Sequence, residues 1–121
     1  MTVNKLTIKD IKAMIEEVGF DFSSKERYLP KLLAFYKIID NEYNCFLHNK
    51  DTSPEEKPNF RNTTCFESAI RWINTGVLKE AWIQLDNAFE LDTDNEYVST
   101  NTLLLLHMVL LTLLVKLGCD V

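Results

Sequence analysis

The sequence predicts an all-α fold: a single domain, residues 1–121, built as an irregular bundle of about five helices around an apolar C-terminal helix. Apolar residues recur at helical spacing along most of the chain. The 121 residues include only three glycines and three prolines, which favours long helices over the many turns of a sandwich or barrel. A chain of this length can bury a core without help from disulfides or a metal.

The first helix is predicted from Ile8 to Val18. Thr7 is suited to cap its start, Asp10 lies in its first turn, and Gly19 follows its last apolar position. One apolar stripe is expected to face the core: Ile8, Ile11, Ile15 and Val18.

A second, longer helix is predicted to continue to about His48. It begins either after Ser24 or after Leu29, which would place Pro30 at the first helical position. The polar segment 49–62 contains two prolines and is predicted to be a loop.

The third and fourth helices are predicted to form an antiparallel hairpin. Thr64 and Glu67 have the spacing of a capping box, so the third helix is expected to run from Thr64 to about Asn74. Gly76 then ends it, and the fourth helix spans 78–91. Because so few residues join the two helices, they must pack against each other.

The last helix is predicted to begin between Glu96 and Thr100 and to reach Gly118. Its apolar segment 103–115 spans 13 residues, about 20 Å as a helix, which is well short of a ~30 Å hydrocarbon layer. A helix that is apolar on all sides is expected at the centre of a bundle, and a membrane anchor is not favoured.

The predicted hairpin has the small residues that close helix packing needs. Gly76 turns the chain, Ala81 and Ala88 permit close approach, and Leu85 fills the space between them. With these residues, segment 62–95 resembles one tetratricopeptide repeat, which implies protein–protein recognition without chemistry. Three residues depart from the family's pattern: Cys65, Ser68 and Thr93. A solenoid needs about three repeats and no second one is detectable, so convergent packing of two amphipathic helices is the alternative.

The negative charge is confined to one half of the chain. Residues 1–61 carry ten basic and ten acidic side chains, whereas residues 62–121 carry three basic and eight acidic ones. Such a surface repels nucleic-acid phosphates and attracts a basic protein partner. The alternative is a solvated acidic surface that only keeps the protein soluble.

The sequence contains no recognisable catalytic, cofactor-binding or metal-binding motif, and no cofactor is expected. Cys45, Cys65 and Cys119 are odd in number and follow no pattern, and no secretory signal is evident, so reduced cysteines in the cytoplasm are expected. The remaining enzyme hypothesis uses Cys65 or Cys45 as nucleophile. Cys65 lies near the predicted start of a helix, which could lower its pKa, and His107 could act as the base.

A candidate binding surface is predicted on the outer side of the fourth helix. Ile83 lies opposite the buried stripe, and Asp86 and Glu90 are a like-charged pair one turn apart. The predicted partner-binding residues are Ile83, Asp86, Asn87, Glu90, Asp92, Asp94 and Glu96. An apolar residue rimmed by carboxylates suits a basic partner; alternatively, Ile83 contacts another helix of the bundle.

Size, charge and the absence of catalytic motifs are similar to those of the small cytosolic immunity proteins that pair with bacterial toxins. The leading hypothesis is therefore an inhibitor that neutralises a basic enzyme, plausibly a nuclease toxin, by electrostatic occlusion. The first alternative is a tetratricopeptide-like adaptor or chaperone-like module. The second is the cysteine-dependent enzyme.

Overall fold

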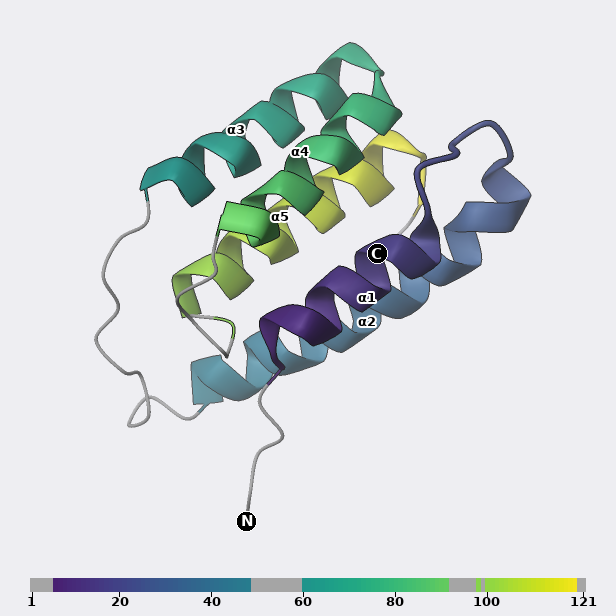
Figure 1. Ribbon diagram of the computed structural model, residues 1–121. Helices are drawn as coiled ribbons and strands as arrows, with labels where there is room; N and C mark the ends of the chain where they lie inside the picture. Colours follow the sequence, from purple (N-terminus) through teal and green to yellow (C-terminus); the bar gives the residue numbers. More distant parts are fainter. Residues whose placement is uncertain (1–5, 49–59, 92–97, 99, 120–121) are drawn as a thin grey trace.

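The computed structural model describes residues 6–48, 60–91, 98 and 100–119, and this part of the chain is all-helical (Figure 1). It contains five α-helices: α1 (Ile8–Val18), α2 (Lys25–His48), α3 (Phe60–Thr75), α4 (Leu78–Leu91) and α5 (Thr100–Lys116). The predicted all-α bundle of five helices is thereby confirmed.

The helices surround a shared core as a closed ring. The main contacts join α1 to α2, α2 to α5, α5 to α3, α3 to α4, and α4 back to α1. In Figure 1, α3 and α4 lie side by side, α5 lies behind α4, and α1 and α2 form the opposite part of the bundle. Each helix therefore turns one side toward the core, which accounts for the amphipathic patterns in the sequence.

Helix α1 begins and ends where the sequence predicts. The Thr7 hydroxyl accepts a hydrogen bond from the Asp10 amide at 3.1 Å, and the Asp10 carboxylate accepts one from the Thr7 amide at 3.1 Å. This reciprocal pair satisfies two amides at the helix start. The predicted stripe of Ile8, Ile11, Ile15 and Val18 is buried.

Helix α2 follows the first of its two predicted alternatives. It starts at Lys25, and the Ser24 carbonyl accepts hydrogen bonds from the amides of Arg27 and Tyr28. Pro30 therefore lies inside the helix rather than at its first position. The loss of one backbone hydrogen bond there is tolerated because Pro30 is exposed and near the helix start.

The predicted start of α3 at a Thr64–Glu67 capping box is wrong. The helix begins one turn earlier, at Phe60, so Thr64 lies inside it. Residues 60–62 of the predicted loop 49–62 therefore belong to α3, and residues 49–59 are outside the described part of the chain. The buried stripe of α3 consists of Phe66, Ala69 and Ile73, and it is the same whether the helix starts at Phe60 or at Thr64. The apolar pattern alone therefore does not show where the helix begins.

The turn between α3 and α4 shows why a glycine is needed there. The Gly76 amide donates to the Ile73 carbonyl and the Val77 amide to the Trp72 carbonyl, each at 3.0 Å, which closes α3 with a Schellman motif. Gly76 has φ +85°, a conformation that costs other L-residues energy. Because α4 starts at Leu78, the two helices form the predicted antiparallel hairpin.

Trp82 joins the hairpin to the N-terminal half of the chain. Its side chain is 1% exposed, and its indole N–H donates to the Ile15 carbonyl of α1 at 3.0 Å. The rings of Phe22 and Phe35 meet the indole edge-on, at centroid distances of 5.8 and 6.1 Å. One side chain of α4 therefore contacts α1, α2 and the segment between them.

Helix α5 supplies a large part of the core but is not buried on every side. Six of its leucine and valine side chains are buried: Leu103, Leu106, Val109, Leu110, Leu113 and Leu114. Leu104, Met108 and Val115 are exposed. The helix lies against α2 and α3, and its third side faces outward. The Lys25 ammonium donates to the Leu117 carbonyl at 2.7 Å and thus ties the start of α2 to the end of α5.

We expect Glu42→Gln to increase the free energy of unfolding at pH 7 by less than about 1 kcal/mol. Glu42 on α2 is partly buried, and burial raises the pKa of its carboxyl group. A raised pKa in the folded state means that stability is lost as the pH rises through that pKa. Glutamine has no such charge, so the difference between the two proteins should shrink below about pH 4.

Chemical denaturation at several pH values tests this expectation. A variant less stable than the wild type at pH 7 would mean that the Glu42 carboxylate makes a favourable contact in the folded protein.

Candidate functional site

Four of the predicted partner-binding residues are described by the structure, and all lie on α4. Ile83 and Asp86 are partly buried, and Asn87 and Glu90 are exposed. Ile83 is not among the apolar side chains that pack on the core, so it remains accessible in part. The other three predicted residues lie outside the described part of the chain: Asp92, Asp94 and Glu96.

Four residues of α4 define what we call the α4 face: Lys79, Ile83, Asp86 and Glu90. Their spacing of four, three and four residues places them on one side of the helix. The Glu90 carboxylate forms an ion pair with the ammonium group of Lys12 on α1. The α4 face therefore runs along the side of α4 that meets α1. The spacing of residues within α4 does not indicate which helix lies beside it.

The Lys12–Glu90 ion pair reduces the negative charge that the sequence assigned to this surface. Both side chains are partly exposed, 27% for Lys12 and 57% for Glu90, so the pair contributes little to stability. A cation from a partner would compete with Lys12 for Glu90. Within the described residues, Asp86 has no ion-pair partner, and it is the carboxylate of the α4 face that is available to a partner.

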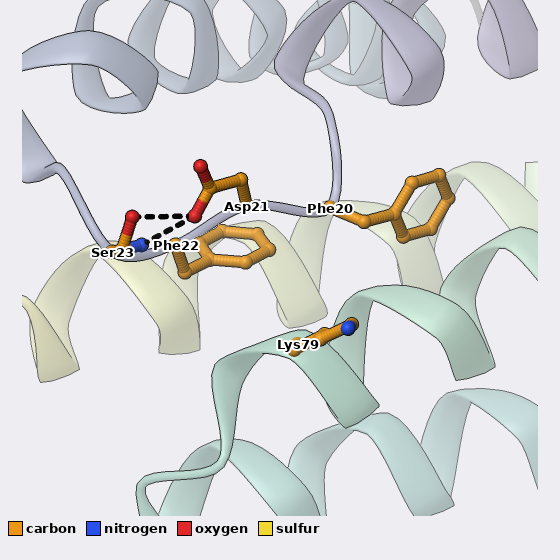
Figure 2. A pocket seen from close by; sticks show the side chains of 5 residues that line it. All are labelled: Phe20, Asp21, Phe22, Ser23 and Lys79. Atoms are coloured by element: carbon orange, nitrogen blue, oxygen red, sulfur yellow. Dashed lines mark hydrogen bonds between the residues drawn. The ribbon is translucent and has the colours of Figure 1, made fainter.

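A pocket lies at the Lys79 end of the α4 face (Figure 2). It has a volume of about 530 Å³ and is lined by Phe20, Asp21, Phe22 and Ser23, which follow α1, and by Lys79. Figure 2 shows the two phenylalanine rings on the same segment as the Asp21 carboxylate, with Lys79 below them on α4. The pocket therefore offers apolar walls bordered by one charge of each sign.

The Asp21 carboxylate at this pocket is held in place by its own loop. It accepts hydrogen bonds from the Ser23 hydroxyl at 2.6 Å and the Ser23 amide at 3.0 Å. These bonds lower the pKa of Asp21, so the group is ionised at neutral pH. The pocket was not predicted, because nothing in the sequence places segment 20–23 next to Lys79.

A second polar group joins α2 to α5. The His107 ring lies 2.9 Å, through Nε2, from an Asp40 carboxylate oxygen. The rings of Tyr36 and Tyr43 flank it, with centroids 5.3 and 4.8 Å away. Burial raises the pKa of the Tyr36 phenol, which stays protonated at neutral pH. The arrangement orients His107 and holds two helices together, as expected of a partly buried histidine with a hydrogen-bond partner.

The structure changes one observation behind the cysteine hypothesis, the position of Cys65 at the start of a helix. Since α3 begins at Phe60, Cys65 lies in its second turn rather than at its N-terminus. Burial raises the pKa of the Cys65 thiol, which lowers the fraction of the nucleophilic thiolate. His107 contacts Asp40, Tyr36 and Tyr43, and its imidazole is directed to α2.

Metal-binding clusters and membrane-spanning helices are both absent from the described residues. In that part of the chain, no three histidine, cysteine, aspartate or glutamate side chains come together as a metal site would require. Nor does any helix described there combine the length and hydropathy needed to cross a bilayer.

No family model matches the chain, and neither a curated protein nor a solved structure matches it significantly. The resemblance of segment 62–95 to a tetratricopeptide repeat is thus carried by its own residues and by the hairpin that α3 and α4 form.

Proposed function

We propose that this chain is a protein-binding inhibitor that neutralises a basic protein in the cytoplasm, in the manner of an immunity protein paired with a toxin such as a nuclease. The observation that carries the proposal is the α4 face. There, a carboxylate without an ion-pair partner among the described residues, Asp86, lies next to the partly exposed Ile83. The pocket lined by Phe20 and Phe22 adjoins it at Lys79.

The chemistry of this surface suits binding better than catalysis. A partner could place an apolar side chain against Ile83 or in the pocket. Its lysine or arginine side chains could approach Asp86 and displace Lys12 from the Glu90 carboxylate. The acidic excess of residues 62–121 would attract such a partner from a distance and speed association. A bound inhibitor blocks its target by covering it, so no reactive group is required.

Affinity capture from the native host at low salt, followed by mass spectrometry and a salt titration, tests the proposal. We expect one basic protein whose release rises steeply with salt, because screening weakens contacts between exposed charges. Recovery of only acidic proteins, or of none, would count against the inhibitor.

A charge reversal then locates the surface. Asp86→Lys should weaken binding of the captured partner at least about tenfold, which corresponds to about 1.4 kcal/mol. Glu67→Lys is the matched control, since Glu67 is exposed on α3 and the change in charge is the same. Equal losses for the two variants would indicate a general charge effect and refute binding through the α4 face.

An adaptor that binds peptides is the second candidate, and it is favoured by the hairpin itself. The α3–α4 pair has the most extensive helix–helix contact in the described part of the chain, as in a repeat unit. This candidate predicts several partners, each released with little dependence on salt.

A further inference from the structure

Four residues of α5 form a second surface, which we call the α5 face: Leu104, Met108, Leu111 and Val115. Leu104 is 36%, Met108 45% and Val115 61% exposed, and Leu111 is partly buried. Their spacing of four, three and four residues places them in one line along the helix. It is the spacing of the a and d positions through which helices pair.

The α5 face carries no charged side chain. Between Asn101 and Val115 the only titratable side chain is His107, which is directed to Asp40 of α2. The first full charge is that of Lys116, next to the end of the line. A continuous exposed apolar line of this kind is typical of a surface that another molecule covers.

We propose that the α5 face binds the α5 face of a second copy of this chain, with the two helices antiparallel. The spacing reads the same in both directions, so a twofold axis between Met108 and Leu111 brings every apolar residue opposite another. Leu104 then meets Val115 of the second copy, and Met108 meets Leu111. Such a self-complementary contact is what a twofold dimer requires, and antiparallel helix dipoles attract each other.

Charge favours a second copy over the other possible occupants. Two chains of net charge −5 repel each other except where they meet through an uncharged face. A basic partner gains its attraction from carboxylates, and the α5 face has none. A helix that lies on a membrane is rich in lysine and arginine, whereas α5 has only Lys116.

The size of the face sets the expected strength of the dimer. A helix of 17 residues is about 25 Å long, and a strip about 10 Å wide along it would bury roughly 500 Å² in total over both copies. Stable interfaces bury about 1,200 Å² or more, so the dimer should be weak, with a Kd between about 10 µM and about 1 mM. It is independent of the proposed inhibitor function, which uses α4.

Sedimentation velocity of the full chain from about 1 µM to about 1 mM tests the proposal, with a dimer forming reversibly as concentration rises. Met108→Lys should raise the Kd at least tenfold. The variant has a net charge of −5 plus 1, or −4, so general repulsion between copies falls. Loss of the dimer in spite of this would locate the contact on the α5 face.

Ile38→Lys is the matched control. Ile38 is 43% exposed, close to the 45% of Met108, but lies on α2, and the change in charge is the same. This variant should dimerise like the wild type. Overturning results would be a wild-type chain that stays monomeric throughout the range, or a dimer that Met108→Lys leaves intact. Flotation of a monomeric wild type with neutral phosphatidylcholine vesicles, abolished by Met108→Lys, would overturn it in favour of a membrane.

The orientation is tested by crosslinking in a chain whose three native cysteines are alanine and which still sediments as a dimer. An equal mixture of Leu104→Cys and Val115→Cys chains should form mainly the mixed disulfide under mild oxidation. Predominance of the two symmetric disulfides would mean parallel helices and would overturn the antiparallel arrangement.

Discussion

Replacing Trp82 with alanine is expected to lower the free energy of unfolding by about 3–5 kcal/mol, the usual cost of removing a large buried aromatic side chain. Trp82 is 1% exposed, touches Phe22 and Phe35, and donates a hydrogen bond to the Ile15 carbonyl. A domain of this size is stable by only about 5–15 kcal/mol, so the variant should be partly unfolded at physiological temperature. Urea denaturation followed by circular dichroism measures the loss.

The chain contains its own control, because its second tryptophan is on the surface. Trp72 is 37% exposed on α3, and Trp72→Ala should cost less than about 1 kcal/mol. Trp82→Phe should fall between the two, since it keeps an aromatic ring but loses the hydrogen bond to α1. Similar losses for Trp72→Ala and Trp82→Ala would contradict the position of Trp82 at the junction of α1, α2 and α4.

Much of the fold could be predicted from the sequence because its signals are local. The capping box at Thr7, the apolar stripe of α1 and the glycine at position 76 each depend on residues a few positions apart. The start of α3 was misplaced for a related reason. Thr64 and Glu67 have the spacing of a cap, but the same spacing also fits a helix interior, and the helix extends back to Phe60.

The candidate site was predicted only in part, because its geometry depends on contacts that are distant in sequence. The position of Ile83, Asp86 and Glu90 on one side of α4 follows from helical spacing. The pairing of Glu90 with Lys12 joins residues 78 positions apart, and the pocket unites segment 20–23 with Lys79. Neither contact leaves a periodic pattern, so the sequence indicates the acidic residues of α4 but not the ion pair of Glu90 with Lys12 or the pocket.

Helix α5 illustrates a different limit. Its 103–115 segment is so rich in leucine that no polar side indicates which direction faces water, and burial on all sides was the natural expectation. In the described part of the chain, however, α5 packs mainly against two helices, α2 and α3. Which leucines are buried is therefore decided by the packing of the whole bundle.

Two leucines of this helix provide a direct test of that packing. Leu106 is 0% exposed and Leu104 is 36% exposed, although they are two residues apart in the same apolar run. Leu106→Ala should cost about 2–5 kcal/mol because it leaves a cavity. Leu104→Ala leaves none and should cost less than about 1 kcal/mol in the monomer.

Urea denaturation of both variants at a low protein concentration, where the proposed dimer is dissociated, gives the comparison. Both variants replace leucine with alanine in the same helix, so helix propensity cannot explain a difference between their free energies of unfolding. Equal large costs would mean that Leu104 is covered within the monomer, and the α5 face would then not be available to a second copy. A large cost at Leu106 with a small one at Leu104 would leave that face exposed, as its pairing requires.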